Sequence, residues 1–425
     1  MINQVVIVAG GKGSRLKSYL GSTPKILMKL NESTLLEMYV KKACEFKIQS
    51  ILFLLHNGAE EVISEIKKIK KKYDIRINFL VEPEPLGTGG SLKYAEKFLE
   101  NEFILFYGDI YININLSNYL SFFEIDSARY AVFSHPNSHM YDSDIIEIGS
   151  NNEIVKFHRK PHDHKLRIRN NVNSGLYLIR KEVLSFAKDL PTKFDLDKEL
   201  IPKLISSSVL GRTIRNLGII KDLGTPERFL EFKNNRNIQA ISYKRPAIFL
   251  DRDGTINELN GFINHETQLK LYPEVPLAIR KFNELGFWVI VVTNQPVVAR
   301  GEATPAKINA IHAEIDSQLS DHGAYVDDYF VCFHHPDKGF PGENKEFKII
   351  CECRKPKIGL INQATEKYPI DLNQSIIVGD TWRDELLAIN SNIQFCQINR
   401  GDKSNLGKGI INSLDQLVDL LPTNR

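Results

Sequence analysis

The chain contains two stretches in which a short strand pattern runs directly into a loop suited to binding phosphate. The first joins residues 5–8 to a glycine-rich loop that begins at Gly10. The second joins residues 247–250 to the sequence Asp-Arg-Asp-Gly-Thr that begins at Asp251. In α/β folds, ligands bind at the carboxyl ends of the strands, where such loops emerge. Two such starts in one chain predict two Rossmann-like α/β domains in tandem.

Alternating strand and helix patterns on both sides of a polar segment set the domain boundaries. In the first half, strand patterns cover residues 5–8, 51–55, 75–81 and 103–106, and helix patterns cover residues 35–46, 59–72 and 91–99. In the second half, strand patterns cover residues 247–251, 288–293, 325–333 and 375–378. The segment between them is polar and ends in a proline, which is typical of a linker. We predict a first domain over residues 1–235, a linker over residues 236–246 and a second domain over residues 247–425.

The composition is that of an ordinary globular protein and narrows the range of partners. Of 425 residues, 42% are hydrophobic and 25% are charged, and the formal net charge is +3. This small charge gives no reason to expect a nucleic acid partner, and no apolar stretch approaches membrane-spanning length. Five cysteines without a disulfide-like pattern favour a reducing cytoplasm. We therefore expect small-molecule substrates; the oligomeric state stays open.

The glycine-rich loop of the first half suits a phosphate group but leaves its ligand open. Backbone N–H groups around Gly10, Gly11 and Gly13 can approach phosphate oxygens, and Arg15 and Lys25 add positive charge. Such turns also occur in dinucleotide sites or as simple tight turns. The glycine spacing departs from the dinucleotide fingerprint, and the Gly-Lys-Ser/Thr of a Walker loop is missing.

Together with its surroundings, this loop resembles the signature of the sugar-1-phosphate nucleotidyltransferases, Gly-Gly-x-Gly-Ser-Arg-Leu with Pro-Lys downstream. Residues 82–90 resemble the nucleoside-contacting loop of that family. Asp109 and Asp222 stand in segments that resemble its two magnesium-holding segments. The resemblance covers most of residues 1–235. It implies that a sugar phosphate oxygen attacks the α-phosphorus of a nucleoside triphosphate and expels pyrophosphate.

The resemblance also implies roles for single residues. Arg15 is expected at the triphosphate tail, Lys25 at the α-phosphate and the incoming phosphate, and Asp109 and Asp222 at Mg²⁺. Catalysis would rest on positioning and charge neutralisation. The residues expected to contact nucleotide or sugar are Gly10, Gly11, Gly13, Ser14, Gly87, Thr88, Lys160 and Asn173. The family's Glu-Lys-Pro reads Arg-Lys-Pro here, with Arg159 in place of the acid, which leaves sugar-hydroxyl recognition open.

The second half carries the groups of a phosphoaspartyl phosphatase. Asp251 would attack phosphorus, and Asp253 would protonate the leaving oxygen and then activate water. Thr293 would donate a hydrogen bond to the phosphoryl group, and Lys355 would supply positive charge. Asp380 would join the two aspartates in holding Mg²⁺. The order of these motifs resembles that of the haloacid-dehalogenase-like phosphatases.

Three of the five cysteines cluster in sequence with a histidine. These four residues are Cys332, His334, Cys351 and Cys353. Thiolate and imidazole are the ligands of structural Zn²⁺, which binds them in a tetrahedron. The adjacent His335 competes for the role, but the Cys-x-His spacing favours His334, and three reduced cysteines near a chance histidine are the plain alternative. We predict a structural zinc site that orders the loop carrying Arg354 and Lys355.

Within that superfamily, the motifs resemble those of the D-glycero-D-manno-heptose 1,7-bisphosphate 7-phosphatases, with histidinol-phosphate phosphatases as near relatives. The match covers residues 247 to about 400. It implies substrate contacts by Asn294, Arg300 and Arg354, with a second phosphate group as one option for Arg354. The family's Ser-Gly after Thr-Asn-Gln is replaced by Pro296 and Val297, so the substrate loop is expected to differ in shape.

The fusion of the two halves indicates heptose metabolism, because the phosphatase product would be the transferase substrate. Heptose 1,7-bisphosphate would lose its 7-phosphate, and heptose 1-phosphate would then receive a nucleotide. The first half resembles the guanylyltransferases that make GDP-D-glycero-α-D-manno-heptose, and the His-x-Gly-His motif of the ADP-heptose route does not occur. This favours GTP and the α anomer. The product would serve a bacterial lipopolysaccharide, capsule or S-layer glycan.

Two alternatives remain open at this point. The chain could join a transferase for another sugar 1-phosphate to a histidinol-phosphate-type phosphatase. One half could instead be a non-catalytic binding module, and only the departures at Arg159 and at Pro296 and Val297 support that reading. Both halves keep the charged groups that their chemistry needs.

Overall fold

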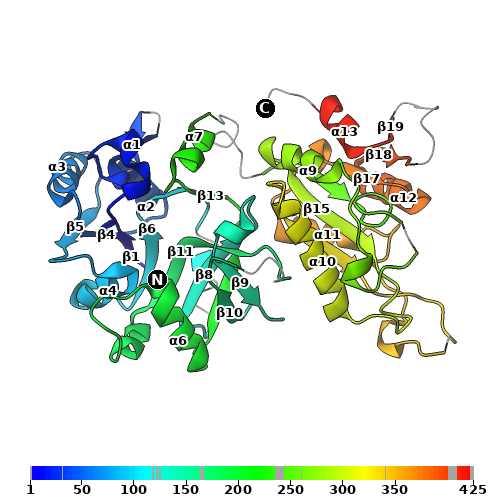
Figure 1. The fold of residues 1–425 in the computed structure, drawn as a ribbon, viewed down its shortest axis with the longest axis horizontal. Coiled ribbons are helices and arrows are strands. Elements are labelled where there is room, and N and C mark those ends of the chain that lie inside the picture. The colour runs from blue at the N-terminus through cyan, green and yellow to red at the C-terminus, as the bar shows by residue number, and fades with distance from the viewer. Residues whose placement is uncertain are drawn as a thin grey trace. The chain divides into compact units, whose positions relative to one another are not determined.

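A computed structural model describes residues 2–30, 32–116, 119–120, 123, 126–162, 167–234, 244–259, 261–339, 341–400 and 409–421. The chain divides into two compact units (Figure 1). The first unit comprises Met1–His135, Asp144–Arg159 and Val172–Arg236, and the second comprises Pro136–Ser143, Lys160–Asn171 and Asn237–Arg425. Two short segments from the first half of the sequence are therefore part of the second unit. Most of the predicted linker, residues 236–243, lies outside the described residues.

The first unit is built on a nine-stranded mixed sheet. Its main path runs β10-β9-β11-β6-β1-β4-β5, and β8 joins β11 to β12. These strands are β1 (Gln4–Val8), β4 (Ser50–Leu55), β5 (Arg76–Val81), β6 (Glu102–Tyr107), β8 (Tyr130–His135), β9 (Ile145–Ile148), β10 (Ile154–His158), β11 (Val172–Arg180) and β12 (Gly211–Arg215). Because β6, β1, β4 and β5 are parallel, their carboxyl ends meet at one edge. In contrast, β11 runs antiparallel to β6.

Two small sheets complete the strands of this unit. One pairs β2 (Lys29–Leu30) with β3 (Ser33–Thr34), and the other pairs β7 (Ile110–Asn113) with β13 (Ile219–Asp222). In the second pair, Asp222 lies opposite Ile110, the residue that follows Asp109. Backbone pairing therefore brings two aspartates together that are far apart in sequence.

Helices surround the strands of the first unit (Figure 1). They are α1 (Lys17–Leu20), α2 (Leu35–Glu45), α3 (Ala59–Ile69), α4 (Gly87–Tyr94), α6 (Ile201–Ser206) and α7 (Pro226–Asn234). The start of α2 follows from its sequence, because the Thr34 side chain accepts a hydrogen bond from the Glu37 N–H. Leu36, Val40 and Ala43 then recur at helical spacing and are buried in the core beside the sheet.

The second unit contains a six-stranded sheet in which every pairing is parallel. Its order is β16-β15-β14-β17-β18-β19. The strands are β14 (Ala247–Leu250), β15 (Trp288–Asn294), β16 (Asp328–Cys332), β17 (Ile376–Gly379), β18 (Gln394–Ile398) and β19 (Ile410–Ile411). The strands β14, β15 and β17 are almost entirely buried, as expected for a sheet covered on both faces. Their carboxyl ends carry the loops that contain the predicted phosphatase residues.

The helices of the second unit are α9 (Val275–Glu284), α10 (Pro305–Ser320), α11 (Gly359–Lys367), α12 (Trp382–Ser391) and α13 (Leu414–Leu420). Helix α12 follows strand β17 after a connection of two residues, Asp380 and Thr381. Thr381 caps α12 by a capping box, in which its side chain and backbone bond to the N–H and carboxylate of Asp384. This cap fixes Asp384 at the edge of the sheet.

The predicted α/β class is confirmed for both units. Each strand pattern named from the sequence is a strand of the sheet, with ends displaced by a few residues. The helix predicted over residues 91–99 begins earlier, at Gly87, and ends at Tyr94. None of the helices in the described parts of the chain is long and apolar enough to cross a membrane.

Candidate active sites and metal centre

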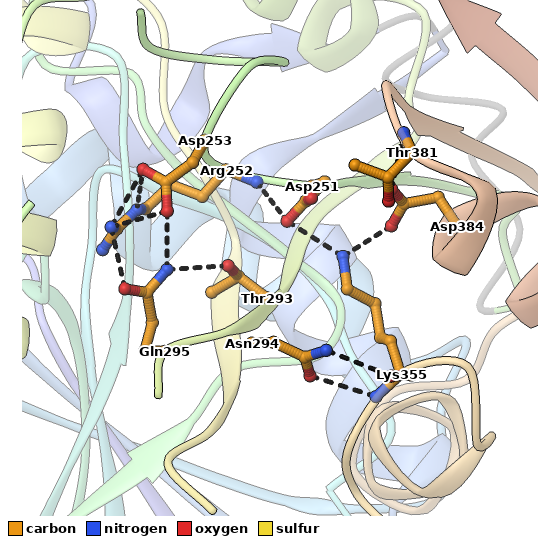
Figure 2. A network of polar contacts seen from close by, with 9 residues as sticks. All are labelled: Asp251, Arg252, Asp253, Thr293, Asn294, Gln295, Lys355, Thr381 and Asp384. Carbon is orange, nitrogen blue, oxygen red and sulfur yellow. Dashed lines mark hydrogen bonds and ion pairs between the residues drawn. The ribbon is translucent and has the colours of Figure 1, made fainter. Parts of the chain in front are cut away.

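The second unit brings Asp251, Lys355 and Asp384 together at the carboxyl end of β14. The Lys355 Nζ lies 2.9 Å from Asp251 Oδ1 and 2.6 Å from Asp384 Oδ1 (Figure 2). Burial raises the pKa of Asp251 to about 7, with Asp384 adding to the shift and Lys355 opposing it. Burial alone would lower the pKa of Lys355, but the two carboxylates outweigh it and raise that pKa. The lysine therefore stays charged beside the predicted nucleophile.

The predicted acid–base residue Asp253 is held by a separate polar network (Figure 2). Its carboxylate accepts hydrogen bonds from the Arg252 guanidinium at 2.8–3.1 Å, from Gln295 Nε2 at 2.8 Å and from Asn257 Nδ2 at 3.0 Å. Burial opposes ionisation, but Arg252 and these hydrogen bonds outweigh it and lower the pKa of Asp253. This arrangement holds Asp253 as a carboxylate, the form that accepts a proton from water.

Thr293 and Asn294 end strand β15 next to these groups. Thr293 Oγ1 accepts a hydrogen bond from Gln295 Nε2 at 2.9 Å, so its own O–H is left to donate to a phosphoryl oxygen. The Asn294 amide makes two hydrogen bonds to the backbone of Lys355, at 3.0 and 3.1 Å. Asn294, predicted as a substrate contact, therefore holds the loop that carries Lys355, the lysine predicted to be catalytic.

Three carboxylates could hold a cation at this site. Asp251, Asp380 and Asp384 each offer an oxygen, and these atoms lie within 4.8 Å of one another. Among the described residues, no hydrogen-bond donor reaches the buried Oδ1 of Asp380. Burial and the Asp384 charge raise the pKa of Asp380. An orphaned oxygen and crowded carboxylates fit a hard divalent cation.

These three carboxylates differ from the predicted magnesium ligands, which were Asp251, Asp253 and Asp380. Asp384 lies among them, and the Asp253 carboxylate is instead paired with Arg252. Gly254 makes the approach of Asp380 possible, since a Cβ at that position would lie 2.2 Å from Asp380 Oδ2. Its φ of +82° is also a conformation that side chains other than glycine rarely adopt. The glycine of Asp-Arg-Asp-Gly-Thr thus leaves room for the Asp380 carboxylate.

The four predicted zinc ligands converge. Their ligand atoms lie within 4.8 Å of one another, with Sγ to Sγ distances of 3.2–3.7 Å among the three cysteines. A tetrahedral ion with Zn–S bonds of about 2.3 Å would hold its ligands roughly 3.8 Å apart. The His334 Nδ1 lies 3.2 Å from Cys353 Sγ, whereas His335 Nδ1 lies 3.7 Å from Asp337 Oδ2. The geometry therefore favours His334 over His335.

The surroundings of these thiols favour their protonated form. Burial and the neighbouring thiols raise the pKa of Cys332 and of Cys353 above the ordinary value. A cation at the centre would reverse that effect, because it stabilises thiolates. The donor set, three thiols and one imidazole, is that of a structural tetrahedral site.

In the first unit, the predicted phosphate and metal groups meet at the edge of the sheet. Lys25 Nζ lies 3.0 Å from Asp109 Oδ2. A Cβ at Gly224 would lie 2.7 Å from Asp222 Oδ1, 3.2 Å from Asp109 Oδ2 and 3.5 Å from Arg15 Nη2. Asp222 also pairs with Arg228, a residue that the sequence analysis did not assign. Two carboxylates, Asp109 and Asp222, and two cationic side chains, Arg15 and Lys25, are thus gathered around Gly224.

The predicted nucleotide loops have contacts of their own. Gly13 has a φ of +63° and precedes a short 3-10 helix that begins at Ser14. The Gly10 carbonyl accepts a hydrogen bond from Asn57 Nδ2 at 2.7 Å. A Cβ added at Gly11 would have no atom of the described residues within 4 Å, apart from those of its chain neighbours. The segment of Gly87 and Thr88 packs on residues 194–196, where the Leu196 N–H donates to Thr88 Oγ1 at 2.8 Å. Backbone at both loops is therefore fixed before any ligand binds.

Asn173 belongs to a buried polar network that the sequence analysis missed. Asn173 Nδ2 donates to the Tyr177 hydroxyl at 2.6 Å, and Tyr177 donates in turn to Asp197 Oδ1 at 2.8 Å. Tyr107 donates to the other oxygen of Asp197 at 2.6 Å. Burial raises the pKa of Asp197 to about 6, although both tyrosines oppose the shift. No sequence motif identifies Asp197; only its hydrogen bonds to tyrosines of the neighbouring strands β6 and β11 do.

Three further predicted substrate residues belong to the second unit, including Lys160, which was predicted for the sugar site of the transferase. Lys160 belongs to that unit, where its Nζ lies 2.8 Å from the Asp142 carbonyl oxygen. Arg300 stacks on Phe262, with its Cζ 4.1 Å from the ring centroid. Arg354 Nη1 donates to the His334 carbonyl at 3.1 Å, which ties it to the cysteine cluster.

Comparison with known proteins gives matches for both halves. Residues 4–238 match the Nucleotidyl transferase family model, and residues 247–397 match the Polynucleotide kinase 3 phosphatase model. A D-glycero-beta-D-manno-heptose-1,7-bisphosphate 7-phosphatase from Yersinia pestis is 39% identical over 148 residues, which is 35% of this chain and 77% of that protein. Its counterpart from Haemophilus influenzae is 35% identical over 178 residues, which is 41% of this chain and 94% of that protein.

Among solved structures, a Bacillus anthracis protein assigned as a glucose-1-phosphate thymidylyltransferase, in complex with a sucrose, has a TM-score of 0.50 and 20% identity. The matched region covers 56% of this chain and 96% of the Bacillus anthracis chain. At this identity the likeness shows a shared fold.

Proposed function

We propose a function from the premise that the chain belongs to the nucleotidyl transferase family through residues 4–238 and to the heptose-bisphosphate 7-phosphatases through its second unit. The chain would remove the 7-phosphate of D-glycero-D-manno-heptose 1,7-bisphosphate. It would then transfer a nucleotide, GMP from GTP, to the resulting heptose 1-phosphate and release pyrophosphate. A nucleoside triphosphate substrate and five free cysteines fit the cytoplasm.

The phosphatase reaction uses the two aspartates in turn. A carboxylate oxygen of Asp251 forms a bond to phosphorus while the bond from phosphorus to the sugar oxygen breaks. Asp253, which has first taken up a proton from solvent, gives that proton to the sugar oxygen. Water then attacks phosphorus, Asp253 takes the water proton, and Asp251 leaves as a carboxylate. Lys355, 2.9 Å from Asp251, neutralises charge on the phosphoryl oxygens.

We assign the metals by donor type. Asp251 and Asp380, with Asp384 beside them, would hold Mg²⁺ in the phosphatase, and Asp109 and Asp222 would hold it in the transferase. When bound, Mg²⁺ supplies positive charge that offsets phosphate oxygens. The three cysteines and His334 would hold a structural Zn²⁺.

In the transferase, the chain's own residues bring two anions together. Lys25 would contact the α-phosphate and the incoming sugar phosphate, and Arg15 the triphosphate tail. The phosphate oxygen of heptose 1-phosphate forms a bond to the α-phosphorus while the bond to the β-phosphate oxygen breaks, and that oxygen leaves with pyrophosphate. No proton transfer is needed, so positioning and charge carry the reaction.

One observation carries the proposal: a chain 39% identical to a heptose-bisphosphate phosphatase over 148 residues also holds a nucleotidyl transferase domain. The two reactions form a sequence only if they share a sugar. The relatives' names specify the β anomer, whereas the sequence analysis favours the α anomer with GTP. Both anomers therefore belong in the test.

The test is mass spectrometry of the products from each anomer of heptose 1,7-bisphosphate with Mg²⁺ and an equimolar mixture of the four nucleoside triphosphates. We expect GDP-heptose. Asp251→Asn should leave the bisphosphate unchanged, and Asp222→Asn should stop at heptose 1-phosphate. Accumulation of heptose 1-phosphate in the wild type would refute the sugar assignment of the transferase. An unchanged bisphosphate would refute the phosphatase assignment and make histidinol phosphate the next substrate to test.

A further inference from the structure

In the first unit, Asp144 lies at a position where one neighbour of strand β11 ends and another begins. Strand β8 pairs with β11 at both ends, at Val172 and at Ile179. Strand β6 therefore lies on the other side of β11, along residues 176–180, and β9 lies on that same side at Val172. Asp144 directly precedes β9, and its carbonyl accepts a hydrogen bond from the Asn173 N–H at 2.9 Å. Asp144 thus stands beyond the carboxyl end of β6.

The segment that contains Asp109, a predicted magnesium ligand, passes close to this position. Tyr107, two residues before Asp109, packs on Gly175, where a Cβ would lie 3.1 Å from the tyrosine ring. Gly175 is two residues from Asn173, and two residues of chain span at most about 7 Å. Because Asn173 is bonded to Asp144, the separation between Asp144 and the magnesium segment is on the scale of one sugar phosphate.

At this position Asp144 forms an ion pair with Arg159. The Arg159 Nη1 lies 3.3 Å from Asp144 Oδ2, and the two side chains are 31% and 16% exposed. Arg159 directly follows β10, whose last residue pairs with the first residue of β9. Two adjacent strands therefore hold the pair, and a ligand can reach both of its side chains.

The pair lies near the buried network of Asp197. The Asn173 side chain donates to the Tyr177 hydroxyl, which donates in turn to Asp197, and a tyrosine of β6 bonds to the same carboxylate. After burial and the two tyrosines, the charges of Asp144 and Arg159 also act on the pKa of Asp197, the first raising it and the second lowering it. The pair, this network and the end of β6 thus form one polar region.

The other side of β6 belongs to the predicted nucleotide site. Strand β1 pairs with β6 on the side away from β11 and leads into the glycine-rich loop that begins at Gly10. A triphosphate on that loop leaves the β11 side of Asp109 for the second substrate.

The charges of the pair indicate which part of that substrate it suits. A carboxylate accepts hydrogen bonds and a guanidinium donates them, whereas a sugar hydroxyl does both. Because the Asp144 charge offsets that of Arg159, the pair attracts a phosphate group less than an isolated arginine would. Acceptors and donors that lie side by side match neighbouring hydroxyl groups of a sugar ring.

We propose that Asp144 and Arg159 are specificity-determining residues of the transferase and bind hydroxyl groups of the sugar 1-phosphate. This inference rests on the proposed function and deepens it. Asp144 accepts hydrogen bonds from the sugar, and Arg159 orients that carboxylate and donates to hydroxyl oxygens. Neither side chain takes part in a bond change, so substitutions act on the use of the sugar phosphate and leave the KM for GTP unchanged.

The test measures pyrophosphate release with GTP from heptose 1-phosphate and from analogues that each lack one ring hydroxyl group. For Asp144→Asn we expect kcat/KM for heptose 1-phosphate to fall about 10- to 100-fold, and the KM for GTP to change less than about twofold. Wild-type protein should discriminate against the analogue that lacks the bound hydroxyl. Asp144→Asn should lose most of that discrimination, because the hydroxyl and the carboxylate then no longer act as a pair.

Two further substitutions complete the series. Arg159→Lys keeps the positive charge and should lose less activity than Arg159→Ala. Glu182→Gln is the matched control, since it removes the carboxylate of an exposed ion pair with Arg129 in the same unit. It should change neither kcat/KM for the sugar phosphate nor the discrimination among analogues.

Equal losses with heptose 1-phosphate and every analogue, no loss with heptose 1-phosphate, or an equal rise in the KM for GTP would overturn this inference and leave the proposed function standing. Wild-type protein that releases no pyrophosphate from heptose 1-phosphate with any of the four nucleoside triphosphates would overturn both. A change in the ratio of kcat/KM values among analogues cannot come from misfolding, because loss of folded protein lowers all of them alike.

Discussion

Lys355 and Asp384 form an ion pair of 2.6 Å in which both side chains are almost fully excluded from solvent. Thr381 donates a further hydrogen bond to Asp384 Oδ2 at 2.6 Å, so the carboxylate is fixed on both oxygens. The Lys355 N–H also donates a hydrogen bond to Asn294 Oδ1. This bond and the ion pair with Asp384 hold the Lys355 Nζ 2.9 Å from Asp251 Oδ1. The position of the catalytic charge thus depends on residues outside the motif that contains it.

Asp384→Asn should therefore reduce phosphate release on the order of 100-fold. The amide is neutral, so Lys355 loses one of two counter-charges and its position beside Asp251 is less restrained. Breaking a buried pair also costs about 3–5 kcal/mol of stability, so activity is measured well below the unfolding midpoint.

Glu385→Gln is the matched control for this substitution. It changes a carboxylate to an amide at the next residue of α12, where the side chain is exposed. Phosphate release by this variant should equal that of the wild type. Equal activity of Asp384→Asn and Glu385→Gln would show that the ion pair is dispensable.

The sequence predicted the class of both domains because its signals are local. A strand pattern such as residues 288–293 becomes β15 (Trp288–Asn294) since its side chains are apolar throughout and suit a sheet buried on both faces. The pairing of β11 with β6 was not predictable in the same way, because antiparallel pairing of distant segments leaves no local pattern.

The sites show the same limit. The proximity of Asp251 and Lys355 and the convergence of the cysteine cluster were predictable, because these residues stand in ordered motifs with fixed spacing. Asp384 was missed as a partner of Lys355 since its role depends on the capping of α12. Asp197 was missed because it lies in a short helical segment and its neighbours Tyr107 and Tyr177 come from two strands, β6 and β11. Such roles depend on packing that brings distant residues together.

Gly224→Ala should impair nucleotide transfer in the first unit. A Cβ there would lie 2.7 Å from Asp222 Oδ1 and 3.2 Å from Asp109 Oδ2, so the two carboxylates would have to separate. We expect at least about tenfold slower pyrophosphate release with heptose 1-phosphate and GTP. Phosphate release from the bisphosphate, measured on the same sample, is the internal control and should be unchanged. Wild-type transfer by this variant would mean that the aspartates do not need their present spacing.

Metal analysis should find one zinc ion per chain, and Cys353→Ser should release it. Without the ion, the loop of residues 332–353 loses its cross-link, so Lys355, two residues after Cys353, is held less firmly beside Asp251. We expect phosphate release to be lost. The unfolding midpoint followed by tryptophan fluorescence should fall, since both tryptophans of the chain, Trp288 and Trp382, lie in the second unit.

Two comparisons give this experiment its control. Cys44→Ser removes a half-buried cysteine of the first unit and should keep the zinc content, the midpoint and both activities. Nucleotide transfer to heptose 1-phosphate should survive in Cys353→Ser. Full zinc content in Cys353→Ser would refute the assignment of this ligand.

Burial of Asp197 predicts a pH dependence of stability in the first unit. Its pKa rises from an ordinary value of 3.8 to about 6 in the folded protein. Between these values the folded state binds more protons than the unfolded state, so stability falls as pH rises. The loss begins near pH 3.8 and is complete above about pH 6. At about 1.4 kcal/mol for each pH unit, it amounts to about 3 kcal/mol.

Asp197→Asn should remove this dependence, because a carboxamide does not ionise. We expect the difference in unfolding free energy between variant and wild type to change by about 3 kcal/mol from about pH 4 to about pH 7, in favour of the variant at higher pH. The unfolding free energy is measured by urea unfolding at each pH. The unfolded fraction is read by pulsed hydrogen–deuterium exchange, at one fixed labelling pH, in peptides of β11, which contains Tyr177. Parallel pH profiles of the two proteins would show that Asp197 does not carry a shifted pKa.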